Sequence, residues 1–122
     1  MGFSRKYIEH FTHPRGIGEV DPADATCQVE HAGEGCFDQI KMSIQVVDGK
    51  ISDLKFRARA CSGTIAACSA VTEIAIGMDV ESAKSITPDD VANFLDGVPE
   101  KKRHSVELAV EALTTAIESL QV

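Results

Sequence analysis

Two segments of alternating apolar and polar residues, on either side of Asp48-Gly49, constrain the fold more than any other feature. Residues 40–46 carry isoleucine, methionine and valine at even positions and polar residues at odd ones. Residues 54–60 repeat the arrangement with leucine, phenylalanine and alanine. Alternation with a period of two indicates strands buried on one face. Asp-Gly between two such segments favours an antiparallel hairpin.

The register of this hairpin depends on which residues share a face. Directly opposed residues of an antiparallel pair point to the same side of the sheet. A two-residue Asp-Gly turn would pair odd with even positions and bring lysines and arginines into the core, so we reject it. We expect a three-residue loop, either residues 47–49, which places Met42 opposite Leu54, or residues 48–50.

Either loop brings two cysteines to the open end of the hairpin. Cys36 lies opposite Ala60 with the first loop and opposite Ser62 with the second, so Cys61 adjoins the facing position in both. Because neighbouring strands lie about 5 Å apart, the two sulfurs can share a ligand. Asp38 projects from the same face as Cys36 if strand alternation persists. Three potential metal-binding atoms thus converge at this end.

The rest of the chain predicts one more strand and several helices. Residues 25–31 alternate as a strand does. Helical spacing, with start and stop signals, marks residues 4–11, 62–76, 87–95 and 106–120. The length of 122 residues fits one domain, residues 1–122. We therefore expect an α+β fold, in which an N-terminal helix and C-terminal helices pack on a three-stranded antiparallel sheet.

Charge and hydropathy exclude several partners. The net charge is −7, and the clustered cations are Lys101, Lys102 and Arg103, whereas a duplex-binding protein needs a basic face. The apolar stretches are far shorter than the ~20 residues that span a bilayer, and charges interrupt the opening segment, so it is not a secretory signal. We expect a cytoplasmic protein, or one in an equivalent reducing compartment, without nucleic-acid or membrane partners.

A reducing compartment changes what the four cysteines indicate. It disfavours structural disulfides, so cysteines there more often bind metal, act in catalysis or fill a core. Cys61 directly precedes a predicted helix, whose dipole and amides lower the pKa of a thiol. Cys36 and Cys61 are therefore candidate ligands, and the alternative is that both are small apolar core residues.

Several segments, in this order and spacing, resemble one protein family. The opening SRKYIEHFTHPRGIG of residues 4–18 resembles its N-terminal helix and a His-aromatic-x-x-Pro-Arg-x-x-Gly signature. Cys36-Phe37-Asp38 resembles its Cys-Gly-Asp loop, and residues 56–66 resemble its second cysteine segment, where a strand turns into a helix. The chain thus resembles the U-type iron–sulfur cluster assembly scaffolds, the family of IscU, the NifU N-terminal domain and SufU, along nearly its whole length.

This resemblance implies a scaffold rather than an enzyme. In the family, three cysteines and one aspartate hold a nascent [2Fe–2S] cluster, or Zn²⁺ in isolated preparations. A pyridoxal-phosphate cysteine desulfurase supplies the sulfur, and iron–sulfur client or carrier proteins receive the cluster. In this chain His104 occupies the place of the third cysteine, and Arg103 that of a family histidine. The implied ligand set is Cys36, Asp38, Cys61 and His104.

His104 is the main departure from the family pattern. A cluster can use histidine at one iron, as Rieske-type sites do, and zinc accepts two cysteines, one aspartate and one histidine. Imidazole cannot take up persulfide sulfur, which is the usual role of the family's third cysteine. The alternative is that His104 is a solvated residue at a helix start. Arg103 cannot bind metal, because its side chain is permanently charged.

Two further departures concern the rim of the site and its partners. Phe37 replaces the family's glycine with a ring that either shields the site from water or crowds it. The Leu-Pro-Pro-Val-Lys chaperone motif is altered to Gly-Val-Pro-Glu-Lys at residues 97–101, which argues against transfer through the dedicated Hsp70-type chaperone. The sequence leaves open whether the chain forms a homodimer around a shared cluster.

The other cysteines and histidines have less direct roles. Cys68 lies about 10 Å along its helix from the site and is expected in the core. Cys27 is also expected in the core, with replacement of the missing third thiol as a minor hypothesis. His10 and His13 are expected to dock or cap the first helix, and His31 is close enough in sequence to reach the site.

Two rival functions compete with the cluster scaffold. The first is a zinc-binding sulfur acceptor that stimulates a desulfurase, similar to the SufU branch. This chain is too short for the insertion that SufU proteins carry before their last helix, which counts against that function. The second rival is a degenerate, regulatory family member that binds partners or a structural zinc.

Overall fold

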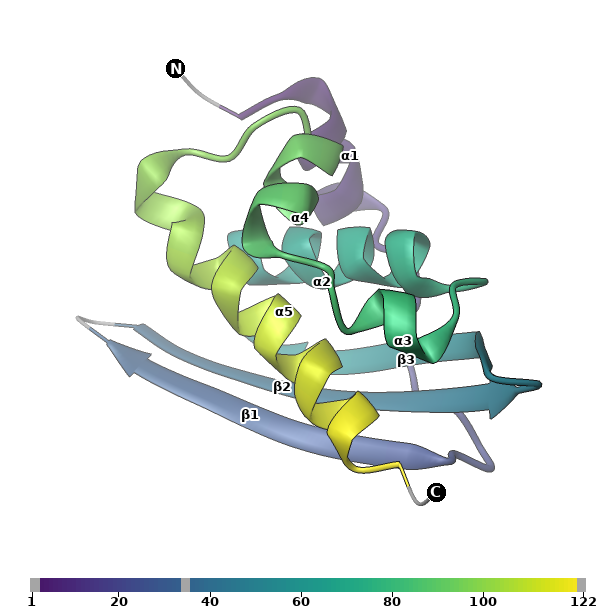
Figure 1. Ribbon diagram of the computed structural model, residues 1–122. Helices are drawn as coiled ribbons and strands as arrows, with labels where there is room; N and C mark the ends of the chain where they lie inside the picture. Colours follow the sequence, from purple (N-terminus) through teal and green to yellow (C-terminus); the bar gives the residue numbers. More distant parts are fainter. Residues whose placement is uncertain (1–2, 34–35, 121–122) are drawn as a thin grey trace.

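The fold is an antiparallel sheet with helices on one of its faces (Figure 1). The computed structural model describes residues 3–33 and 36–120, and the side chains of residues 32–37 lie outside this description. The elements are β1 (Ala25–Gly33), β2 (Cys36–Val47), β3 (Lys50–Arg59), α1 (Arg5–Thr12), α2 (Ser62–Ala75), α3 (Val80–Ala83), α4 (Pro88–Phe94), the 3-10 helix Glu100–Lys102 and α5 (Arg103–Glu118). The three strands pair in chain order. The predicted α+β class and three-stranded sheet are confirmed.

Alternation along β2 and β3 produces the core, as the sequence predicts. The even-numbered side chains toward the middle of both strands are completely buried, namely Ile40, Met42, Ile44, Leu54 and Phe56. They lie in one apolar cluster with residues of α2 and α5, the helices next to the sheet in Figure 1. Within the described ranges, no helix has the length and apolar character needed to cross a membrane.

The turn between β2 and β3 differs from the predicted three-residue loop. Val47 pairs with Lys50, so the turn contains two residues, Asp48 and Gly49. Their φ angles are 52° and 77°, and positive values at both central positions characterise a type I′ turn, whose twist matches that of the paired strands. The prediction of a three-residue loop is therefore wrong.

A β-bulge reconciles this turn with a buried face. Gln45 pairs with Asp53 but Val46 pairs with Ile51, so Ser52 is an extra residue on β3. One inserted residue reverses the side-chain parity along a strand. Accordingly, the odd-numbered Ile51 is buried beside the turn, whereas even positions are buried beyond the bulge. Parity along the two strands predicts the turn only for an unbroken ladder, and the bulge at Ser52 breaks it.

Beyond the bulge, the register is that of the second predicted loop. Met42 pairs with Phe56 and not with Leu54. The ladder between β2 and β3 ends at the pair Gln39–Arg59. The chain therefore leaves the sheet just before the start of α2, and the first residues of β2 extend past the last β3 partner.

A buried histidine fixes α1 to α2. His10 is 1% exposed, and its Nδ1 lies 2.7 Å from Ser69 Oγ on α2. Its ring and that of Phe94 form a T-shaped pair, with ring centroids 5.5 Å apart. At the other end of α1, Ser4 caps the helix by accepting a hydrogen bond from the Tyr7 amide. The predicted docking role of His10 is confirmed.

Candidate metal centre

A buried carboxylate marks the junction between the sheet and α2. Asp38 lies on the core-facing side of β2 and is completely buried. The amide of Cys61 donates to its Oδ1 at 3.1 Å, and the Thr64 hydroxyl donates to its Oδ2 at 3.1 Å. A carboxylate away from water requires such partners. These two hydrogen bonds also tie the start of α2 to β2.

Cys61 occupies the N-cap of α2. Its backbone is extended, with φ −70° and ψ 168°, and its side chain makes no capping hydrogen bond. Its Sγ lies 3.6 Å from both Thr64 Oγ1 and Ser105 Oγ. Burial raises the pKa of the Cys61 thiol, but hydrogen bonds from Thr64 and Ser105 outweigh burial and lower the pKa overall. The lowered pKa favours thiolate, which is the form that binds metal.

His104 reaches the same point from the first turn of α5. Its Nε2 lies 3.8 Å from Asp38 Oδ2, and its side chain is 34% exposed. One ligand atom each of Asp38, Cys61 and His104 lie within 4.8 Å of one another. Ligands on one tetrahedral ion with bonds of 2.0–2.3 Å are about 3.3–3.8 Å apart. The three donors therefore need to close by roughly 1 Å to share an ion, which small side-chain rotations provide.

Cys36 has a described backbone but no described side chain. It pairs with Gly33 at the end of the β1–β2 ladder. The predicted position opposite Ala60 is wrong, because the observed register is that of the second loop. The position opposite Ser62 fits this register, but the β2–β3 ladder ends before that pair would form. The expectation that Cys36 shares a face with Asp38 falls on a side chain that lies outside the described residues. Its role as a ligand stays a prediction, and so does the effect of Phe37, whose side chain also lies outside the described residues.

The other two cysteines lie away from this centre. Cys27 pairs with Met42, four residues or about 13 Å along β2 from Asp38, and its Sγ donates to the Ala112 carbonyl at 3.1 Å. Cys68 is completely buried in the core, which confirms its predicted role. Burial raises the pKa of both thiols. The distance of Cys27 from Asp38 argues against Cys27 as the replacement for the missing third thiol.

Hydroxyl groups around Cys61 were not among the predicted site residues. Thr64 follows Cys61 by three residues and Ser105 follows His104 by one, so both are neighbours in sequence of a predicted ligand. A third hydroxyl, that of Tyr7, is buried and has no hydrogen-bond partner among the described residues. Burial and the charge of Cys61 raise the pKa of Tyr7 to about 12. Spacing from a candidate ligand would have identified Thr64, but nothing in the sequence places Tyr7 here.

Arg103 does not point its charge at the candidate ligands. Its guanidinium donates to Asp89 Oδ1 on α4 at 2.8 Å. This ion pair fixes the start of α5 against α4. The arginine that occupies the place of a family histidine therefore has a structural contact of its own, as expected of a residue that cannot bind metal.

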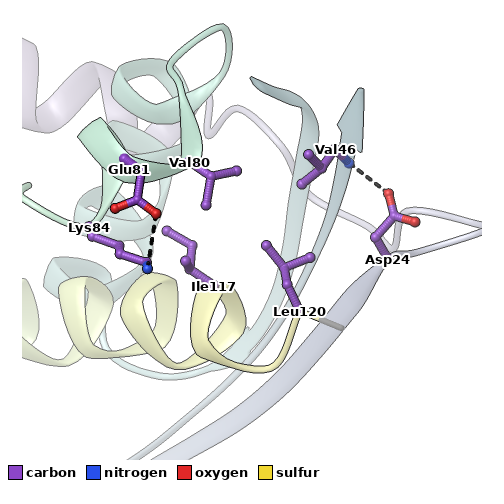
Figure 2. A pocket seen from close by; sticks show the side chains of 7 residues that line it. All are labelled: Asp24, Val46, Val80, Glu81, Lys84, Ile117 and Leu120. Carbon is purple, nitrogen blue, oxygen red and sulfur yellow. Dashed lines mark hydrogen bonds and ion pairs between the residues drawn. The ribbon is translucent and has the colours of Figure 1, made fainter. Parts of the chain in front are cut away.

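A groove at the opposite end of β2 has a different chemistry (Figure 2). Its lining consists of Asp24, Val46, Val80, Glu81, Lys84, Ile117 and Leu120. Asp24 Oδ2 accepts a hydrogen bond from the Val46 amide at 2.7 Å, and Glu81 pairs with Lys84 at 3.3 Å, the two contacts dashed in Figure 2. These lining residues include neither cysteine nor histidine. Their charged side chains make the two contacts just described, within the protein itself. The groove is therefore not a second candidate metal centre.

Known sequences resemble this chain along nearly its whole length. The NifU-like N terminal domain family matches residues 2–122. The iron-sulfur cluster assembly scaffold protein IscU 1 of Archaeoglobus fulgidus is 39% identical over 115 residues, which cover 94% of this chain and 74% of that protein. The scaffold protein IscU of Escherichia coli is 36% identical over 124 residues, covering 96% of this chain and 92% of its own.

Solved structures share the fold. A NifU-like protein (N-terminal) from Brucella abortus superposes with a TM-score of 0.77 at 18% identity, covering 95% of this chain and 92% of that one. A putative SUF-system scaffold from Fervidobacterium islandicum superposes with a TM-score of 0.70 at 17% identity, covering 94% and 96%. At these identities the structures establish the fold alone. The family match over residues 2–122, with relatives 36–39% identical over most of their length, shows that this chain belongs to the NifU-like N-terminal domain family.

Proposed function

We propose that this protein is a scaffold for the assembly and transfer of a labile [2Fe–2S] cluster, which it binds as cargo. The observation that carries the proposal is the meeting of Asp38, Cys61 and His104, whose ligand atoms lie within 4.8 Å of one another. Cys36 precedes Asp38 by two residues and is the proposed fourth ligand. The names of the relatives support the proposal, since proteins 36–39% identical are called iron-sulfur cluster assembly scaffolds.

Each residue has a separate role in this proposal. The thiolates of Cys36 and Cys61 bind iron, and one of them accepts the outer sulfur of a cysteine persulfide on the desulfurase, because His104 cannot carry persulfide. The S–S bond of the desulfurase persulfide breaks and leaves its thiolate, and two electrons from an external thiol or electron-transfer protein then reduce the accepted sulfur to sulfide. Asp38 supplies a hard oxygen donor, which binds iron less firmly than thiolate in a sulfur-rich site and therefore permits release. His104 lies at the partly exposed side of the centre, where a client or carrier protein can reach it. The chain acts as a carrier and catalyses no bond-breaking step of its own.

Anaerobic reconstitution with ferric iron and sulfide, which together have the electron count of an oxidised [2Fe–2S] cluster, tests the scaffold. Wild-type protein is expected to develop the visible absorption and Mössbauer spectrum of a [2Fe–2S] cluster, and Cys36→Ala and Cys61→Ala should both lose it. Cys27→Ala is the matched control, because it removes a cysteine about 13 Å from the site. Wild-type protein without a cluster, or full assembly in Cys61→Ala, would contradict the proposal.

A zinc-binding sulfur acceptor is the second candidate function. The mixture of one carboxylate, one thiolate and one imidazole in the described cluster favours it, because structural zinc accepts all three donor types. In this case protein purified without oxygen would contain one Zn²⁺ per chain and would stimulate a cysteine desulfurase in the absence of iron. Iron in place of zinc, with no stimulation of the desulfurase, would exclude this second function.

A further inference from the structure

Strand β1 brings a second imidazole to the candidate metal centre. His31 pairs with Asp38 across the β1–β2 ladder, and directly opposed residues project from the same face of a sheet. The ring of His31 lies beside that of His104, with centroids 5.5 Å apart and planes inclined by 30°. His31 therefore adjoins two of the three clustered donors, although it belongs to a different element from both.

The separation of the two rings suits a shared metal ion. Imidazoles bound to one tetrahedral Zn²⁺ at 2.0–2.1 Å have ring centroids roughly 5 Å apart, close to the observed 5.5 Å. Rings that only pack against each other span about 4.5–7 Å, so the distance alone does not decide. The surroundings favour metal, because Asp38 Oδ2 lies 3.8 Å from His104 Nε2 and the Cys61 thiol belongs to the same cluster.

Because its side chain is exposed, His31 is able to turn toward the other metal ligands. The clustered donors within 4.8 Å of one another are those of Asp38, Cys61 and His104, so the His31 ring must turn toward them to coordinate. Its side chain is exposed, and exposed side chains change rotamer within picoseconds to nanoseconds. Asp38, in contrast, is held by hydrogen bonds from α2. The centre thus combines a fixed carboxylate with an imidazole that can approach and leave.

We propose that His31 is a further ligand of this centre. Before sulfur arrives, it forms with His104, Cys61 and Asp38 a four-donor site for a single divalent cation of borderline softness, such as Zn²⁺ or Fe²⁺. His31 then holds the fourth position, which Cys36 is proposed to take in the assembled cluster. Two imidazoles, one thiolate and one carboxylate are donors that such ions accept together. The inference rests on the proposed function, because it gives the scaffold a way to hold one metal ion before any sulfur arrives.

Titration of Zn²⁺ into ¹⁵N-labelled protein tests this ligand directly. At one equivalent, we expect an imidazole nitrogen of His31 and one of His104 to move together to metal-bound shifts. His13, exposed just after α1, serves as the internal control and should keep its metal-free shifts. A titration in which His104 responds and His31 does not would overturn the proposal.

A pair of variants measures how much His31 contributes. His31→Gln should weaken Zn²⁺ binding by roughly 100-fold or more, since loss of an outer-shell partner alone costs about 10–100-fold. His13→Gln is the matched control and should bind as wild type does. Thermal unfolding without metal checks the fold of His31→Gln, which should match wild type because the side chain is exposed. Unchanged Zn²⁺ affinity in the folded variant would remove His31 from the ligand set.

The two proposals fail in different ways. If wild type assembles the cluster and His31→Gln binds Zn²⁺ as tightly as wild type, only the His31 ligand is refuted. If wild type assembles no cluster but both His31 and His104 shift with Zn²⁺, the scaffold is refuted and the zinc site stands. Cys61→Ala distinguishes specific from surface binding, because it should lose Zn²⁺ together with the shifts of both histidines.

Discussion

Gly63 lies where the start of α2 closely approaches its neighbours. A Cβ atom placed there would lie 2.6 Å from Tyr7 Oη, 3.1 Å from Lys102 Cδ and 3.2 Å from Ser105 Oγ. The first distance is shorter than carbon and oxygen tolerate without a shift of one of them. The Tyr7 hydroxyl has no hydrogen-bond partner among the described residues, so it occupies this space without a compensating bond.

Substitution at Gly63 should therefore depend on Tyr7. Gly63→Ala is expected to lower the free energy of unfolding by about 1–3 kcal/mol through overpacking, which outweighs the ~1 kcal/mol that alanine gains over glycine in a helix. Tyr7→Phe alone should be neutral or stabilising, because it removes a buried hydroxyl without a described partner. In the Tyr7→Phe background, Gly63→Ala should lower the free energy of unfolding by clearly less than it does in wild type. Urea unfolding of the four proteins measures this coupling, and an equal cost in both backgrounds would contradict the contact.

At the scale of elements, the contact of α1 with α2 depends on a neutral histidine. Burial lowers the pKa of His10, and the positive charge of Arg15 lowers it further, while Glu73 opposes both effects. The folded state therefore binds a proton at His10 less readily than the unfolded chain, whose histidine titrates near 6.5. The contribution of neutral His10 to the free energy of unfolding is therefore fully present above about pH 6.5. It is lost as the pH falls from there toward the lower pKa of the folded state.

A pH series should reveal this dependence. The free energy of unfolding of wild type is expected to fall between pH 7.5 and 5.5 more steeply than that of His10→Gln, which cannot titrate. The variant will be less stable at pH 7.5, because the contact of His10 with Ser69 is lost or altered. Urea unfolding at several pH values measures both slopes. Parallel slopes would mean that His10 titrates alike in the folded and unfolded states.

The hairpin shows what pattern alone predicts at the scale of an element. Alternation identified both strands and their buried faces, because burial on one side imposes a period of two. The type I′ turn and the bulge at Ser52 change the register without changing the overall pattern of the strands. Asp-Gly did indicate the observed turn. Alternation alone excludes this turn, because the extra residue at Ser52 that restores the buried face leaves no mark in the pattern.

At the scale of the whole molecule, the candidate metal centre joins parts of the chain that are far apart in sequence. Asp38 comes from β2, Cys61 from the start of α2 and His104 from α5. Figure 1 shows these elements near the end of the sheet where β1 ends and β2 begins. A metal ion held by all three links the sheet to both helices next to it. Binding should therefore stabilise the entire fold.

Zinc is expected to raise the melting temperature. At a free concentration 100 times Kd, binding adds about 2.7 kcal/mol, which corresponds to roughly 10 °C for a domain of this size. Removal of the metal with a chelator should reverse the shift. Calorimetry of wild type, Cys61→Ala and Cys27→Ala with and without Zn²⁺ measures it. The same shift in Cys61→Ala as in wild type would place the zinc elsewhere.

The sequence by itself determined the α+β class, the buried faces of β2 and β3, and the helix that begins after Cys61. These features follow from local periodicity and capping, which depend on neighbours along the chain. Only the tertiary structure decided the bulge at Ser52, the distance of Cys27 from the centre, and the approach of His31 and Tyr7 to it. Those outcomes depend on how strands pair and how helices pack across the sheet, and no local pattern encodes such long-range contacts.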